Sequence, residues 1–212
     1  MNGLPEGAFR REDERGDAAF YAAARLVTHI DEEAIEAVTQ LYREYMPAGG
    51  AILDLMSSWV SHLPPEVAYG RVVGLGMNEA ELVANPRLGD YVVQDLNREP
   101  RLPFGDGEFD GAGICVSIQY LTRPVEVLRE VGRVLKVGAP LVITFSNRCF
   151  PTKAVRVWLT LDDDGHGRLV ERYLEATGCF VGIERLDRSS ERGDGSGSSR
   201  GDPLFAVVGR RG

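Results

Sequence analysis

Four side chains that can hydrogen-bond a small ligand stand near the ends of four short apolar segments. These side chains are Asp54, Asn78, Asp95 and Ser117, and the segments cover 51–55, 71–75, 90–93 and 109–116. A carboxylate at the end of a buried strand costs free energy unless donors or a cation partner it. Asp54 and Asp95 are therefore candidates for binding amine groups of a ligand, and Asp54 can alternatively cap the loop that follows it.

The segments that carry these residues have the pattern of buried strands. Each contains Val, Ile or Leu and gives way to small or polar residues at its carboxyl end. Such strands, separated by helices, form an open α/β sheet, and ligands bind where the carboxyl ends of the strands meet. The sequence therefore predicts an α/β fold with a ligand-binding crevice along one edge of the sheet.

Capping residues predict the helices between the strands. Asp31 is a plausible N-cap for a helix over 31–46, and Asn78 with Glu81 has the spacing of a capping box. Pro64-Pro65 limits the helix after the first strand to little more than a turn. Further helices are predicted over 124–138 and over 153–177 with a break at 162–165, and further strands over 141–145, 179–186 and 204–209.

Composition and charge exclude several classes of function. With 212 residues and a net charge of −8, the chain lacks the basic surface that nucleic acid or an anionic membrane requires. We find no secretory signal and no apolar run long enough to span a membrane. The sequence predicts a cytoplasmic protein that binds neither nucleic acid nor membrane, and it favours no particular oligomeric state.

The cysteines and histidines do not have the spacing of a metal site. The three cysteines are odd in number and widely separated, which fits reduced thiols better than disulfides. The three histidines are equally scattered, so no metal is expected. These residues are Cys115, Cys149, Cys179, His29, His62 and His166.

The chain is expected to form one domain with a mobile tail and one disordered loop. Residues 1–17 are rich in Gly, Arg, Glu and Asp and suit a flexible amino-terminal tail. Residues 18–212 have the length of a single domain. Within them, 188–202 is rich in Gly and Ser and is expected to be disordered between the last two strands.

Two stretches resemble the class I S-adenosylmethionine-dependent methyltransferases of the type 11 group. Residues 102–110 read LPFGDGEFD, similar to that family's approach to its fourth strand. Residues 128–141 read LREVGRVLKVGAPL, similar to its E-x-x-RVLKPGG-x-L motif. The resemblance extends from about 51 to 146. It implies a Rossmann-like sheet of seven strands, mostly parallel with an antiparallel last strand, helices on both faces, and S-adenosylmethionine as cofactor.

The first loop departs from the family pattern. The family has Asp-x-Gly-x-Gly-x-Gly there, whereas this chain has Met56, Ser58 and Val60 in place of the glycines. Glycine allows backbone amides to approach a ligand, and serine hydroxyls can donate hydrogen bonds in their place. A second departure is Gly76, which stands where the family's ribose-binding acid is expected. The sequence thus resembles a divergent branch with a glycine-poor first motif.

The resemblance assigns cofactor roles to the strand ends. It implies that Asp54 orients the amino group of the methionine part, and that Asp95 and Leu96 bind the adenine. Asn78 can reach a ribose oxygen or only cap its helix, and Cys115 is more plausible as a packing residue than as a nucleophile. The full set of cofactor candidates is Asp54, Leu55, Met56, Ser57, Ser58, Gly76, Met77, Asn78, Asp95, Leu96, Cys115, Val116 and Ser117.

The segment before the first long helix carries candidates for a lid. Tyr21, Arg25 and His29 are four residues apart, so a helix over 20–29 would put them on one face, toward the crevice or toward solvent. Tyr21 and His29 are the candidates for a general base, on position alone. Tyr120, Asn147 and Arg148 are the candidates on the acceptor side.

These observations favour transfer of a methyl group from S-adenosylmethionine to a small-molecule acceptor by in-line displacement. Such a reaction needs alignment in a dry pocket and no catalytic triad. A protein that kept the fold and only binds or regulates is the alternative, favoured by the missing glycines and the missing acid. A nicotinamide-dependent oxidoreductase is disfavoured because no Gly-x-Gly-x-x-Gly follows the first strand.

Overall fold

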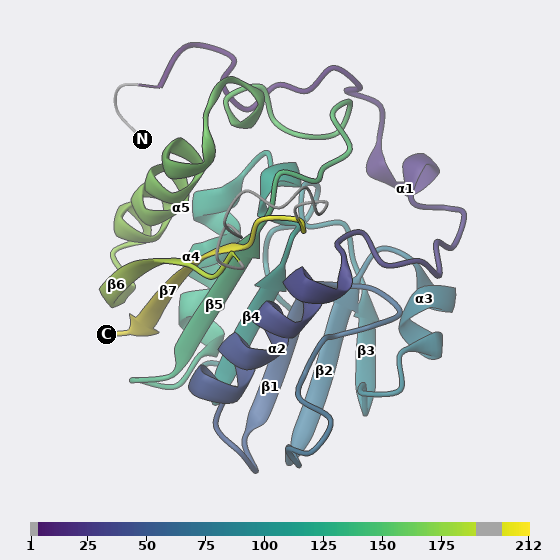
Figure 1. Cartoon of the computed structure of the whole chain (residues 1–212), viewed down its shortest axis with the longest axis vertical. Coiled ribbons are helices and arrows are strands. Elements are labelled where there is room, and N and C mark those ends of the chain that lie inside the picture. Colours follow the sequence, from purple (N-terminus) through teal and green to yellow (C-terminus); the bar gives the residue numbers. More distant parts are fainter. Residues whose placement is uncertain (1–3, 190–200) are drawn as a thin grey trace, which may run out of the picture.

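A seven-stranded sheet forms the centre of the molecule, and its strand order is β3-β2-β1-β4-β5-β7-β6 (Figure 1). The structure is a computed structural model that describes residues 4–189 and 201–212. β1 to β5 run parallel, while β7 pairs antiparallel with β5 and with β6. The strands are β1 Ala51–Ser57, β2 Arg71–Gly76, β3 Asp90–Val93, β4 Gly111–Cys115, β5 Pro140–Phe145, β6 Phe180–Asp187 and β7 Phe205–Arg211.

Helices cover both faces of the sheet, which confirms the predicted fold class. α2 (Glu32–Tyr45) packs its Val38, Leu41 and Tyr42 against one face, in a cluster with Ile52 of β1. α4 (Pro124–Val134) and α5 (Asp163–Thr177) pack with Leu53 and other residues of the opposite face. Neighbouring residues of β1 thus enter different cores, because successive side chains of a strand point to opposite faces.

Most element boundaries follow the predicted caps. Asp31 accepts a hydrogen bond from the Ala34 amide at the start of α2. Asn78 accepts one from the Glu81 amide at the start of α3 (Glu79–Ala84). The short helix of little more than a turn expected after β1 does not form: residues 58–70 contain no helix, and Pro64-Pro65 lies within them.

The break predicted at 162–165 is wrong, because these residues begin a helix. Asp162 is the N-cap of α5 and accepts from the Gly165 amide at 2.8 Å. Acidic residues favour the first turn of a helix, where unpaired amides and the helix dipole attract negative charge. The stretch before α5 holds only a short 3-10 turn at Trp158–Thr160.

The flexible tail expected over residues 1–17 is contradicted for its described part. Residues 4–16 run along the segment 152–157, with backbone hydrogen bonds from the Val157 amide to Ala8 and from the Arg156 amide to Arg10. Ala8 is buried in the main core. The charged residues that suggested a tail instead supply ion pairs, which lead into the short helix α1 (Asp17–Phe20).

Most of the loop expected to be disordered, 190–200, lies outside the described residues. At its flanks Arg188 forms an ion pair with Glu44, and the Asp202 amide donates to Asp31. Among the described helices, none is long and apolar enough to cross a membrane.

Gly113 should be intolerant of a side chain because β4 lies directly under α2. A Cβ atom at Gly113 would meet the Tyr42 hydroxyl oxygen at 2.7 Å. We expect Gly113→Ala to lower the free energy of unfolding by about 1–3 kcal/mol in urea denaturation, the usual cost of overpacking. Gly16→Ala is the control, since a Cβ there meets nothing within 4 Å. Equal stabilities of the two variants would contradict this packing.

Candidate functional site

A cavity of about 290 Å³ opens at the carboxyl ends of the parallel strands. Its wall contains Asp54 and Met56 of β1, Gly76 of β2, the loop after β3, and Cys115 of β4. The predicted residues that the structure brings into this wall are Asp54, Met56, Ser57, Ser58, Gly76, Met77, Asn78, Asp95, Leu96, Cys115, Val116, Ser117, Tyr21, Arg25, His29, Tyr120 and Arg148. The crevice predicted from the strand ends is therefore present.

Two predicted residues are not in the cavity wall. Leu55 is fully buried in the main core, because it points to the face that α4 covers. Asn147 is exposed, and its side-chain oxygen accepts a long hydrogen bond from Ser146. The position of Leu55 follows from the alternation of side chains along β1.

Asp54 is a buried carboxylate supported by two serines. The hydroxyls of Ser57 and Ser61 both donate to Oδ2 at 2.6 Å. Within the described residues, none donates to Oδ1. Burial raises the pKa of Asp54 to about 6, against the opposing effect of the two hydrogen bonds. The second oxygen is thus available to a donor or cation in the cavity.

The serines belong to a polar cluster that fixes the loop after β1. Asn85, at the end of α3, donates to the Ser58 carbonyl at 2.8 Å and to the Ser61 hydroxyl at 2.9 Å. The loop is thereby tied to α3. Ser61 and Asn85 were not among the predicted residues, since neither lies at a strand end.

The backbone around the cavity is strained at three residues. Met56, His62 and Val116 have φ angles of 58°, 51° and 40°, and they are the non-glycine residues with positive φ in the described part of the chain. All three line the cavity. Met56 stands where the resembling family has glycine, so the chain keeps the left-handed conformation without the residue that favours it. Such strain concentrates at functional sites.

Gly76 cannot be replaced by a larger residue without moving β1. A Cβ at Gly76 would lie 2.2 Å from the Ser57 carbonyl oxygen. This close approach coincides with a shift of the β1–β2 register between Leu55 and Ser57. The absence of the family's acid at this position is therefore built into the path of the backbone.

Asn78 caps α3 and also holds the lid segment. Its side-chain oxygen accepts from the Glu81 amide, and its nitrogen donates to the carbonyls of Tyr21 at 2.8 Å and Ala22 at 3.2 Å. Of its two predicted roles, the structure shows the cap. The second half of the predicted capping box is replaced, because Glu81 Oε1 accepts from the Arg25 amide at 2.7 Å.

Residues 21–30 contain no helix, so of the two possibilities for this segment, a short helix or an ordered lead-in, the helix that would put Tyr21, Arg25 and His29 on one face does not form. The three side chains nevertheless all line the cavity. Anchors from other segments, at Asn78, Glu81 and Trp59, hold this extended stretch over the site; the Trp59 indole donates to the Val27 carbonyl at 3.0 Å. These contacts with other segments determine the path of residues 21–30, and the spacing of residues within the segment cannot reveal them.

The two candidate bases differ in their electrostatics. Burial holds the pKa of Tyr21 well above its ordinary value, so the phenol stays protonated near neutral pH. Burial lowers the pKa of His29, so its imidazole is neutral and can accept a proton. His62 also lines the cavity with a pKa lowered by burial, and it was not predicted.

The part of the cavity wall that contains Tyr120 and Phe150 is aromatic. Tyr120 stacks on Phe150, and the Tyr120 hydroxyl accepts from the Phe150 amide at 2.9 Å. Arg25 lies over the Phe20 and Phe150 rings, 4.6 and 5.6 Å from their centroids. Arg148 is paired with Asp202 at 2.7 Å, which neutralises its charge.

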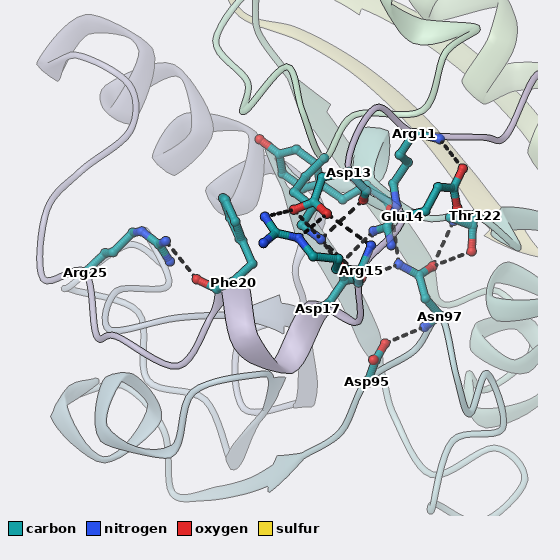
Figure 2. A network of polar contacts seen from close by, with 12 residues as sticks. Arg11, Asp13, Glu14, Arg15, Asp17, Phe20, Arg25, Asp95, Asn97 and Thr122 are labelled. Atoms are coloured by element: carbon teal, nitrogen blue, oxygen red, sulfur yellow. Dashed lines mark hydrogen bonds and ion pairs between the residues drawn. The ribbon is translucent and has the colours of Figure 1, made fainter.

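Asp17 connects this side to the loop after β3 (Figure 2). Arg11 donates to both carboxylate oxygens of Asp17 at 2.8 Å, and the side-chain nitrogen of Asn97 donates to Asp17 Oδ2 at 2.9 Å. The buried Lys153 lies 3.1 Å from Oδ1. Burial alone would raise the pKa of Asp17, but these donors outweigh it and hold the pKa below its ordinary value.

Asp95 is on the same loop as Asn97. Asp95 Oδ1 accepts from the backbone amide of Asn97 at 3.0 Å. Asn97 Oδ1 in turn accepts from the backbone amide of Thr122 (Figure 2). Asp17 and Asn97 line the cavity but were not predicted. Asp17 lies in the segment that was interpreted as a tail, and the partners of Asn97, which are Asp17 and Thr122, are distant in the sequence.

The Cys115 thiol in the cavity wall stays protonated near neutral pH. Burial raises the pKa of the Cys115 thiol to about 12, which fits its predicted packing role. No group of three or more metal-ligating side chains is found among residues 4–189 and 201–212.

Comparison with known proteins connects this geometry to methyltransferases. Residues 56–143 match the family model described as a methyltransferase domain. The match begins two residues after Asp54, where the first loop departs from the family pattern. A search of curated proteins gave no match.

Solved structures share the fold at low sequence identity. A SAM-dependent methyltransferase from Archaeoglobus fulgidus gives a TM-score of 0.60 at 15% identity, covering 85% of this chain and 95% of that chain. A chain of the complex between the Haloferax volcanii Trm112 methyltransferase activator and the putative methyltransferase gives a TM-score of 0.62 at 13% identity, covering 85% of this chain and 91% of that chain. The [4+2]-cyclase SpnF gives a TM-score of 0.60 at 16% identity, covering 89% of this chain and 88% of that chain.

Asp54 should make folding stability depend on pH. Its folded pKa of about 6 exceeds the unfolded value of about 3.9, so the native state binds more protons between these values. The stabilising contribution is fully present below pH about 4 and is lost as pH rises through about 6. It amounts to on the order of 3 kcal/mol. Urea denaturation should show this loss in the wild type relative to Asp54→Asn; a pH-independent difference between the two would contradict it.

The strained backbone at Met56 should reverse the usual order of alanine and glycine. Met56→Gly should be more stable than Met56→Ala by about 1 kcal/mol, because a Cβ is unfavourable at positive φ. At Met77, which also lines the cavity but has no positive φ, alanine should be the more stable by about 0.5–1 kcal/mol. Thermal denaturation of the four variants measures both differences, and the same order at both positions would argue against strain at Met56.

Proposed function

We propose that this chain, whose residues 56–143 match a methyltransferase domain, transfers the methyl group of S-adenosylmethionine to a small-molecule acceptor. The observation that carries the proposal is the cavity itself. It joins Asp54, Asp95 and Leu96, at the family's cofactor positions, with the covering segment 21–30. A covered cavity suits a small acceptor better than a macromolecular one.

Asp54 and Asp95 have free acceptor oxygens for the two amines of the cofactor. In our proposal Asp54 Oδ1 accepts from the methionine ammonium, while Ser57 and Ser61 hold Oδ2. Asp95 accepts from the exocyclic amine of adenine, since Asn97 occupies only its Oδ1. The Leu96 amide, which donates to no described residue, is available to a ring nitrogen.

The reaction needs the acceptor to be aligned with the sulfonium methyl group in a pocket that excludes water. The cofactor supplies the electrophilic carbon when it is bound. Tyr21, Tyr120 and Phe150 form an apolar wall for the acceptor. His29 is the best-placed group to take a proton, since burial lowers its pKa and keeps it neutral. The free thiols of Cys115, Cys149 and Cys179 support a reducing, cytoplasmic location.

A protein that binds the cofactor without turnover is the second candidate. The observation that favours it is the exclusion of an acid at Gly76 by the Ser57 carbonyl. The shared fold of the cyclase SpnF shows that the architecture alone does not determine the reaction. Transfer of a labelled methyl group to a small molecule distinguishes catalysis from binding.

Cofactor binding can be tested without knowing the acceptor. S-adenosylhomocysteine should raise the melting temperature and bind in calorimetry, since a ligand of the folded state stabilises it. Asp95→Ala should weaken binding by about 1–3 kcal/mol, the usual cost of losing a charge-assisted hydrogen bond. Asp90→Ala, an exposed carboxylate at the other end of β3, is the control and should bind normally. Stabilisation by NADH and none by S-adenosylhomocysteine would refute the proposal.

A further inference from the structure

We infer that Glu81 binds the ribose hydroxyls of the cofactor, in place of the acid that the resembling family carries at the end of its second strand. The inference rests on the proposed function, because it assumes a nucleoside ligand. A carboxylate is the expected partner for two adjacent hydroxyls, since each of its oxygens can accept a hydrogen bond. The question is which residue near the end of β2 can supply one.

Gly76 and Asn78, the two residues near the end of β2 that the sequence suggested for the ribose, cannot supply a free side chain. Gly76 has no space for a side chain, because the Ser57 carbonyl oxygen would lie 2.2 Å from its Cβ. The Asn78 side chain is engaged at both ends, by the Glu81 amide and by the carbonyls of Tyr21 and Ala22. The end of β2 therefore presents no free polar side chain to a ribose.

Glu81 is the carboxylate that the segment after β2 brings to the cavity. It lies in the first turn of α3, is only 9% exposed, and lines the cavity. Its Oε1 accepts from the Arg25 amide, and within the described residues no donor reaches Oε2. A largely buried carboxylate with one donor is undersatisfied, and a ligand hydroxyl would complete it.

The other carboxylates of the cavity wall have different partners. Both oxygens of Asp17 are occupied by Arg11, Asn97 and Lys153. Asp54 belongs to β1 and Asp95 to the loop after β3, on either side of β2 in the sheet. Glu81 is left as the acid at the level of β2, where the family binds ribose.

The same carboxylate holds the segment that covers the cavity. Oε1 accepts from the Arg25 backbone amide, and in our inference Oε2 accepts from the ribose. A purely structural role is therefore the competing explanation: Glu81 would only anchor residues 21–25. The two roles predict different responses to removal of the ribose hydroxyls.

The test compares the affinities of S-adenosylhomocysteine and of its analogue lacking the 2′- and 3′-hydroxyls, measured by calorimetry. In the wild type, the analogue should bind about tenfold or more weakly, the size expected for hydrogen bonds to a charged group. In Glu81→Gln this preference should shrink to about threefold or less. Circular dichroism verifies the fold of each variant. The control is Glu79→Gln, which removes the same charge from the same turn at an exposed site outside the cavity wall and should keep the wild-type preference.

Each other outcome overturns the inference. If Glu81→Gln weakens both compounds equally and keeps the preference, Glu81 is only an anchor for the lid. If the wild type binds both compounds equally, the hydroxyls have no carboxylate partner. If the wild type binds neither compound, the proposed function fails first, and this inference with it.

Discussion

The backbone path just after Asp54 is the constraint on which the site depends. There β1 shifts register against β2, Met56 adopts a left-handed conformation, and the Ser57 carbonyl comes over Gly76. The turn brings the Ser57 hydroxyl, and Ser61 a few residues later, onto Asp54. It also removes the space for an acid at the end of β2. A single local geometry thus brings two serine hydroxyls onto the Asp54 carboxylate and leaves no room for a carboxylate at Gly76.

The carboxylates around the cavity are supported in two different ways. Asp17 is paired with the cations Arg11 and Lys153, so its charge is neutralised inside the protein. Asp54, Glu81 and Asp95 are held by hydroxyl or amide donors, which orient an oxygen without cancelling its charge. Only the second group keeps a negative charge to offer a ligand, because a cation already balances Asp17. The part of the cavity wall that contains Asp54, Glu81 and Asp95 is therefore electrostatically distinct from the amino-terminal part that contains Asp17.

The sequence was informative where structure follows from short-range patterns. The strand over 90–93 and the caps at Asp31 and Asn78 depend on residues within a turn of one another, and the structure confirms them. The crevice could also be predicted, since parallel strands bring their ends together. Asp17, Asn97 and Glu81 could not be assigned, because their positions depend on contacts between distant segments. Likewise, the sequence of 21–30 does not indicate that the segment forms no helix and is held by hydrogen bonds to Trp59, Asn78 and Glu81.

The amino-terminal wall has a consequence for the order in which the molecule assembles. Residues 8–17 form an early part of the chain, yet their partners at 152–157 are about 140 residues away, as in the contact from Lys153 to the Asp13 carbonyl. During synthesis this wall has nothing to dock on until β5 and the segment beyond it have been made. Contacts of such long sequence separation form slowly, because loop closure must precede the gain in contact energy. This side of the cavity can therefore close only after the segment 152–157 has been made, whereas the pairing of β1 with β2 and of β2 with β3 needs only residues up to 93.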